Sequence, residues 1–377
     1  MVKCFSFTAS KNRCLRSTFS GSGLRSTVTD LGDGTVMHCW VPKTRRSTRA
    51  DLVLLHGFGA NSMWQWGDTV RILSPHFNIY VPDLVFFGES YSTRPERSDA
   101  FQAQCVKRAL EANSVGGKIH VAGLSYGGFV AYSLAAQFRD SVEKVVICCA
   151  GVCLEDKDLK EGLFPVDNVE EAADILLPQT AEKMRELMRF TFVKPPAKVL
   201  PSCLLTDFID RVINKSNRIK IPKSLQPSST SLLRCVRSRR PPTSIIAETA
   251  TTPDLATVLA SRWFSFSPPS RSNSAIIILL LLSKKMESSR RCAILLARCP
   301  AHFTADGLEM FTEYVEEKKE LLRAIASNRK LSELPKITQP TLILWGDQDK
   351  IFPIQLAHRL KRFLSGSGLV GPTDGLL

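Results

Sequence analysis

The segment Gly123–Gly128 reads Gly-Leu-Ser-Tyr-Gly-Gly and places one serine, Ser125, two residues from a glycine on each side. An apolar stretch at 118–122 precedes it and another at 129–136 follows it, which predicts a sharp turn from a buried strand into a helix. Such a turn, the nucleophile elbow, exposes a serine hydroxyl for attack on a carbonyl carbon and requires neighbours without bulk. Alone it is a weak signal, because a glycine-rich structural turn would look the same.

A second glycine-flanked loop adds to the chemistry that Ser125 would need. The apolar run 51–55 predicts a buried parallel strand and leads directly into His56-Gly57-Phe58-Gly59. Attack on an ester creates an oxyanion, which is stabilised by two preorganised N–H donors. The backbone N–H groups of Phe58 and Tyr126 are the expected donors. We interpret His56 as a residue that hydrogen-bonds this loop rather than as a catalytic base.

A third candidate loop follows the apolar run 341–345, where Asp347 and Asp349 lie between Gly346 and Pro353. Two acids at the end of a predicted strand are compatible with a solvated turn. Because they come after Ser125 in the chain, they are also compatible with the acid of a Ser…Asp…His triad.

Together these segments resemble the α/β-hydrolase superfamily, and within it the plant enzymes related to monoacylglycerol lipases and carbon–carbon bond hydrolases. The matching segments are 56–59, 81–84, 87–90, 123–128 and 345–353. The resemblance covers residues 20–210 and 308–363. In this family the catalytic acid is the Asp of the pattern Trp-Gly-x-x-Asp-x-x-x-Pro. This resemblance implies Asp349, the second of the two acids, rather than Asp347. The resemblance implies hydrolysis of a carboxylic ester, with a lipid monoester as one candidate, and it implies no cofactor and no metal.

The family also requires a histidine beyond one further strand after Asp349, and here the sequence departs from the family. No histidine follows His358, and no apolar strand is predicted after residue 364. His358 itself is predicted on the surface or packing side of a helix over 353–364. The six histidines are His38, His56, His76, His120, His302 and His358.

Loss of the general base costs a serine triad several orders of magnitude in rate. The sequence therefore predicts an impaired serine hydrolase. The alternative is a non-catalytic protein of the same fold that binds a small ligand.

The net charge of +14 is concentrated in one block, because residues 211–305 carry 16 Lys/Arg against three Asp/Glu. The block has no sustained helical or strand period, so disorder is expected. Basic arms bind nucleic acid, but no interleaved aromatic residues support that function here, and no nucleic-acid partner is predicted. The apolar run 275–282 is shorter than the roughly 20 residues that span a bilayer. No transmembrane segment is predicted, although peripheral membrane contact remains open.

Alternating strand and helix patterns predict an α/β protein with a mostly parallel sheet, helices on both faces and an N-terminal antiparallel hairpin at 27–41. A helical lid is expected to follow, in which Met184 and Met188 are candidates to line an acyl pocket, as is Trp64 near the Phe58 loop. Helix packing is the alternative for all three. The predicted parts are a core (1–154), the lid (155–210), the basic insert (211–307), the end of the lid and core (308–364), and an aberrant tail (365–377).

The composition also suggests a cellular location for this protein. The 11 cysteines form no Cys-x-x-Cys pair, which favours a reducing compartment. The first 29 residues contain basic and hydroxyl residues but no acid, a composition typical of an organellar transit peptide. Because the resemblance already begins within this segment, the cytoplasm is predicted ahead of the chloroplast. We hypothesise that 211–307 and the tail are translated non-coding sequence.

Overall fold

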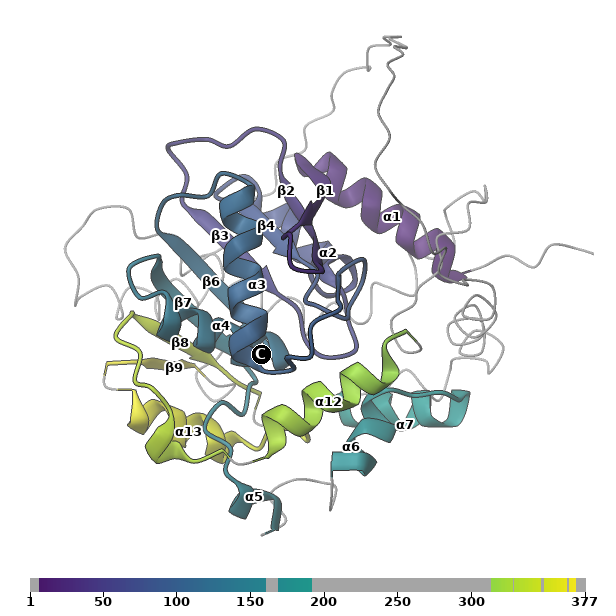
Figure 1. The fold of residues 1–377 in the computed structure, drawn as a ribbon, viewed down its shortest axis with the longest axis vertical. Helices are drawn as coiled ribbons and strands as arrows, with labels where there is room; N and C mark the ends of the chain where they lie inside the picture. The colour runs from purple at the N-terminus through teal and green to yellow at the C-terminus, as the bar shows by residue number, and fades with distance from the viewer. Residues whose placement is uncertain are drawn as a thin grey trace, which may run out of the picture.

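The computed structural model describes residues 7–160, 169–191, 313–327, 329–346, 349–364 and 366–370. The described strands form one sheet with the order β1-β2-β4-β3-β6-β7-β8-β9, and β5 pairs with β2 beside this path (Figure 1). The strands are β1 (Leu24–Asp30), β2 (Thr35–Pro42), β3 (Asp51–Leu55), β4 (Asn78–Pro82), β5 (Tyr91–Ser92), β6 (Ile119–Leu124), β7 (Val142–Cys148), β8 (Thr341–Leu344) and β9 (Gly368–Val370).

Neighbours in the row β4-β3-β6-β7-β8-β9 pair in parallel, whereas β1 and β2 form an antiparallel hairpin at one edge. The central strands are mostly apolar and buried, as is typical of a parallel sheet with helices on both faces. Since parallel strands end at the same edge, the loops after β3, β6, β7 and β8 come together there. The predicted mostly parallel sheet with its N-terminal hairpin is confirmed.

Two hydrophobic cores lie on opposite faces of this sheet. One contains Leu15 of α1 (Phe7–Gly21) and Trp66 of α2 (Ser62–Leu73). The other contains Phe101, Phe129 and Leu356. These three residues come from α3 (Asp99–Ala112), α4 (Tyr126–Gln137) and α13 (Ile354–Phe363). The sheet is therefore fully sandwiched and can hold its loops rigidly.

Helix α1 was not predicted, and the composition of this segment instead suggested a transit peptide. Leu15 and Phe19 are four residues apart, so they lie on one helical face, and both are buried. A Cβ atom added at Gly67 of α2 would lie 2.3 Å from Leu15 Cδ2, which shows how closely the two helices pack. The described part of the N-terminal segment is thus an integral part of one core.

Four further helices surround the carboxyl side of the sheet: α5 (Asp156–Lys160), α6 (Val169–Leu176), α7 (Ala181–Thr191) and α12 (Val315–Ala326). Helices α6, α7 and α12 lie side by side in Figure 1, and Arg323 of α12 donates to Glu170 of α6 at 2.9 Å. The boundaries of the core, lid and tail stay predictions, and the basic insert 211–307 lies outside the described residues.

The expectation that no strand follows residue 364 is wrong. Strand β9 pairs in parallel with β8, with Leu342 opposite Gly368 and Leu344 opposite Val370. Three residues are too few to show a sequence period. The hydrogen-bonding groups that order them belong to β8, so only the folded sheet defines this strand.

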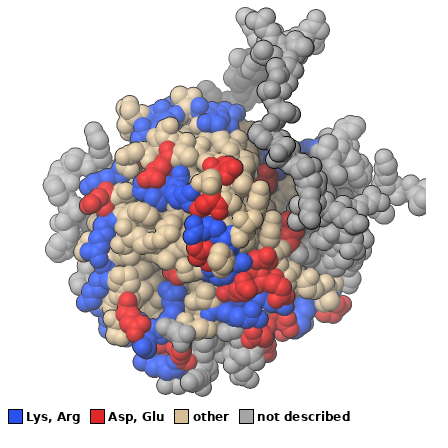
Figure 2. All heavy atoms as spheres, in the orientation of Figure 1, with Lys and Arg blue, Asp and Glu red and all other residues tan. Residues whose placement is uncertain are grey.

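The described surface has no segment suited to crossing a membrane: none of the described helices is both long and apolar enough. On the face shown in Figure 2, basic and acidic side chains are interspersed over the described residues. The strongly basic block lies outside them.

Candidate active site

Ser125 occupies a strained backbone conformation between β6 and α4, with φ 52° and ψ −119°. A non-glycine residue at positive φ is uncommon and is held by its surroundings. Those surroundings exclude bulk: a Cβ atom at Gly123 would lie 2.0 Å from Gly127 O, and one at Gly127 would lie 2.4 Å from Leu55 O. The Ser125 N–H donates to Cys148 O at 2.8 Å. The segment therefore has the backbone shape of a nucleophile elbow.

The loop after β3 lies directly against this turn. Leu55 pairs with Gly123 in the sheet, and a Cβ atom at Gly57 would lie 3.4 Å from Ser125 Cβ. The Phe58 ring meets the Tyr126 ring edge-on, with a centroid distance of 5.9 Å. Tyr126 begins α4, where the first backbone N–H groups have no acceptor within the helix. The two loops expected to supply oxyanion donors are thus neighbours, while the roles of Phe58 and Tyr126 stay predictions.

His56 has a structural role in this loop. It is fully buried, and its Nδ1 and Nε2 lie 2.9 Å from Gly57 O and from the N–H of Leu84, respectively. A neutral ring with its proton on Nδ1 satisfies both contacts, since Nε2 must accept. Burial lowers the pKa of His56, in keeping with that neutral form. The interpretation of His56 as a residue that hydrogen-bonds its loop is confirmed.

Asp349 lies in the loop after β8, and its Oδ1 accepts the N–H groups of Ile351 and Phe352, each at 2.9 Å. Burial raises the pKa of Asp349, against the effect of these N–H donors and of the neighbouring Cys149 thiol. Asp347 lies outside the described residues.

Cys149 is a site residue that the sequence analysis missed. It follows β7, the strand between those that lead to Ser125 and Asp349, and it has a positive φ of 45°. Burial, together with the charge of Asp349, raises the pKa of the Cys149 thiol well above its usual range, so the thiol stays protonated beside the Asp349 carboxyl group. Its position immediately after a buried strand was the available signal.

The described histidines do not complete a triad with Ser125. His358 is exposed on α13, as predicted, and His76 is exposed as well. His120 is buried in β6, beside the ring of Phe77. Among the residues described, no histidine hydrogen-bonds Ser125 or Asp349, and His302 lies outside them.

The candidate pocket residues lie in two different places. Met184 is buried and Met188 half-buried on α7. The C-terminal part of α7 touches the Asp349 loop, since Lys350 Nζ donates to Arg189 O at 3.2 Å. Trp64 packs on the α1 side of the sheet, where its indole N–H donates to Asn12. The structure therefore brings α7 toward the candidate site, and a pocket role for each residue stays a prediction.

A sheet of this order, an elbow at the end of β6 and a glycine loop beside it define a hydrolase-type fold. The sequence model of the family described as alpha/beta hydrolase fold matches residues 52–195. Over these residues the chain matches that family, and its sheet has the α/β-hydrolase fold.

Two curated proteins are similar to parts of this chain. One is a pimeloyl-acyl-carrier protein methyl ester esterase of Pectobacterium carotovorum, 29% identical over 33% of this chain and 46% of its own length. The other is the Xenopus laevis monoacylglycerol lipase abhd6-A, 29% identical over 44% of this chain and 52% of its own length. The chain thus spans about half the length of the curated relatives it matches.

Solved structures show the same fold. The crystal structure of a putative lipase from Acinetobacter baumannii matches with a TM-score of 0.57 at 18% identity, covering 98% of this chain and 89% of the other. A membrane phospholipase A matches with a TM-score of 0.53 at 18% identity, covering 96% and 83%.

Proposed function

We propose that this chain is a serine hydrolase of carboxylic esters whose turnover is slow because no histidine among the described residues serves Ser125. The observation that carries the proposal is the strained backbone of Ser125 packed against the Gly57 loop. Strain of this kind is kept where the surrounding structure imposes it, and such positions cluster at functional sites. Esterase and lipase relatives support the same class of substrate.

In the proposed reaction, Ser125 Oγ attacks the ester carbonyl carbon. The N–H groups of Phe58 and Tyr126 would hold the oxyanion as it forms. In a complete triad, a histidine oriented by Asp349 would take the serine proton and return it to the leaving alcohol. Without that base, oxyanion stabilisation and binding remain, worth about 10³–10⁴ over the uncatalysed rate in serine proteases.

The substrate would be a small-molecule ester, with an acylglycerol-type monoester as the more specific proposal. Helix α7 carries Met184 and Met188 and reaches the Asp349 loop, so these thioether side chains are the proposed contacts for an acyl chain. Trp64 is the weaker candidate, because its indole group faces α1.

The test is covalent labelling of the full chain with a fluorophosphonate, followed by mass-spectrometric mapping of the labelled peptides. Ser125 should be labelled slowly, and Ser125→Ala should remove the label from that peptide. Ser133→Ala is the matched control, because Ser133 lies two turns along the same helix and accepts a hydrogen bond from Gln137. Absence of label on Ser125 in folded protein would refute the proposal.

A non-catalytic ligand-binding protein is the second candidate, and the Cys149–Asp349 contact favours it. The carboxyl group that would orient a histidine instead lies beside a protonated thiol. This function predicts saturable binding of a non-hydrolysable ester analogue without labelling of Ser125 and without turnover of p-nitrophenyl butyrate. Measurable turnover that disappears in Ser125→Ala would exclude it.

A further inference from the structure

A second serine, on the antiparallel hairpin, is hydrogen-bonded to a histidine and an aspartate. Ser26 Oγ lies 2.8 Å from His38 Nε2, and His38 Nδ1 lies 2.8 Å from Asp83 Oδ2. The three residues come from β1, β2 and the loop that follows β4. These two hydrogen-bond distances are those expected between a nucleophile and a base, and between that base and the group that orients it.

Asp83 is fixed as an ionised partner. It is buried, and its carboxylate accepts the N–H of Ser62 at 2.7 Å and that of Glu89 at 3.2 Å. Burial alone would raise the pKa of Asp83, but the neighbouring His38 and the N–H donors hold it well below its usual range. The carboxylate is therefore charged at neutral pH and holds Nδ1 of His38.

His38 is the base of this cluster. Burial acts to lower its pKa, but the Asp83 carboxylate outweighs burial and raises the pKa above 6.5. Glu89 acts in the same direction and Arg16 in the opposite one. Arg16 and Glu89 pair at 2.8 Å, so they largely offset each other. With Nδ1 held by Asp83, Nε2 is the nitrogen that faces the Ser26 hydroxyl.

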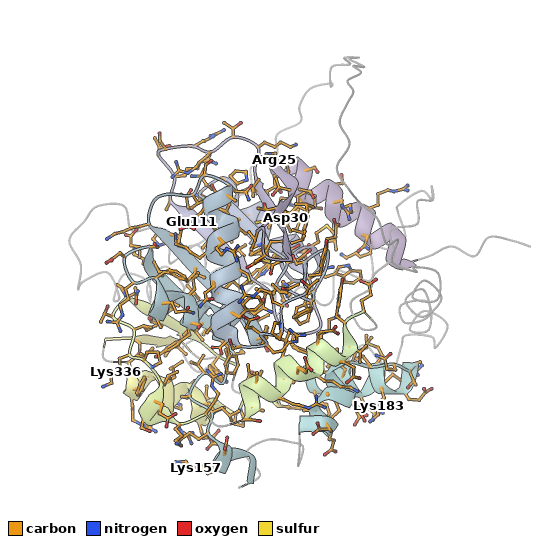
Figure 3. All side chains as sticks on the ribbon, viewed as in Figure 1. Arg25, Asp30, Glu111, Lys157, Lys183 and Lys336 are labelled. Atoms are coloured by element: carbon orange, nitrogen blue, oxygen red, sulfur yellow. The ribbon has the colours of Figure 1, made fainter. Side chains whose placement is uncertain are left out.

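Ser26 is accessible, unlike its two partners. It is exposed on β1, which pairs with β2 along one side only, and Figure 3 labels Arg25 and Asp30 near the two ends of this strand. Side chains two residues apart on a strand share a face, so Val28, which is 60% exposed, lies beside Ser26. A hydroxyl beside an exposed apolar side chain is open to a small acyl group.

The backbone of Ser26 can assist as well. Hydrogen-bonded and non-hydrogen-bonded residue pairs alternate along the β1–β2 ladder. The hydrogen bonds from Leu31 N to Thr35 O and from Lys43 N to Gly23 O show which pairs are hydrogen-bonded. In that alternation the N–H of Ser26 faces away from β2. It is a donor at the open edge of the sheet, next to its own hydroxyl.

We propose that Ser26, His38 and Asp83 form a second nucleophilic site, which takes acyl groups from small activated carboxylic esters such as aryl esters. Ser26 Oγ attacks the carbonyl carbon while its proton passes to His38 Nε2. The ester C–O bond then breaks, and His38 returns the proton to the leaving aryloxide, so that an acyl ester of Ser26 and a phenol result. The site does not depend on Ser125.

The experiment treats the full chain with p-nitrophenyl acetate or a fluorophosphonate and maps the modified residues by mass spectrometry. Ser26 should be modified, and its rate should rise with pH through a pKa above 6.5, because the base must first lose its proton. Replacing His38 with Gln should slow Ser26 modification by about 100-fold or more, the typical contribution of a general base. Labelling of Ser125 should be unaffected by Ser26→Ala.

The matched control moves the hydroxyl by one residue. In Ser26→Ala combined with Thr27→Ser, the new serine lies on the other face of β1, where Thr27 now donates to Cys39 O rather than to His38. Residue 27 should stay unmodified. The proposal would be overturned if the serine at position 27 of the double variant were modified as fast as Ser26 of the parent. It would also be overturned if the rate of Ser26 modification did not change with pH. The pH profile of the unaltered chain decides the matter even if His38→Gln fails to fold.

Discussion

Ser125 and Ser26 each have what the other lacks. Ser125 lies in a strained turn between two loops that can donate backbone N–H groups, but no described histidine reaches it. Ser26 lies on an ordinary extended strand and is hydrogen-bonded to a histidine that a buried carboxylate orients. The proposed Ser125 site would stabilise the oxyanion, and the proposed Ser26 site would transfer the proton.

The difference shows that the two requirements for serine chemistry arise at different levels of structure. The elbow is local, because the clashes that select glycine involve the chain within a few residues and the adjacent strand. The Ser26 cluster joins residues 12 and 45 positions apart, which meet because of strand register. Three predictions test how far each site depends on its own supports.

The largest effect is expected at His38. At pH 6, His38→Gln should lower the free energy of unfolding by about 3 kcal/mol, because it removes one partner of a buried ion pair. The raised pKa of His38 gives stability that is present below pH 6.5 and lost as pH rises through the folded pKa. The lowered pKa of Asp83 gives stability that is lost only as pH falls below about 4.

The difference in the free energy of unfolding between parent and variant should therefore be largest between about pH 4 and 6.5 and should become smaller above that range. Urea unfolding across pH 4–9 measures it. His76→Gln, at an exposed histidine, is the control and should change stability by no more than about 0.5 kcal/mol. A gap that widened above pH 7 would contradict the assigned pair.

An intermediate effect is expected at the elbow. Gly127→Ala should lower the free energy of unfolding by about 1–3 kcal/mol, because the added Cβ would overlap Leu55 O and His56 O and force the backbone to shift. Labelling of Ser125 should fall with it, while labelling of Ser26 should not. Gly116→Ala, where no atom lies within 4 Å of the added Cβ, serves as the control. Equal stability of the two variants, measured by thermal unfolding, would argue against the close packing of the elbow.

The smallest effect is expected at Asp349. Because no histidine of the described residues contacts Asp349, Asp349→Asn should change ester turnover by less than about twofold, whereas loss of the corresponding acid costs an intact triad about 10⁴. Because burial raises the pKa of Asp349, its charged form is disfavoured in the folded state. The Asn variant should thus be no less stable than the parent at pH 7, with any difference vanishing below about pH 4. A drop in turnover beyond tenfold would reveal a base that Asp349 orients.

Much of the fold could be predicted because the signals are short and local. The apolar runs at 51–55 and 341–345 became β3 and β8, and the helix expected over 353–364 became α13. Helix α1 escaped because two apolar residues, Leu15 and Phe19, carry its burial within a basic, hydroxyl-rich segment. Strand β9 escaped because its ordering comes from β8.

For the candidate site, the sequence by itself predicted the turn at Ser125 and the Gly57–Gly59 loop, because strain and close approach restrict residue types one position at a time. The choice of Asp349 as the acid came from the family resemblance and stays a prediction. The tertiary structure alone decided which groups meet: Cys149 with Asp349, Gly57 with Ser125, and Ser26 with His38. Those contacts depend on strand order and register, which follow from how the whole sheet buries its two faces. A hydrogen bond between residues far apart in the chain leaves no local pattern, so only the folded molecule shows it.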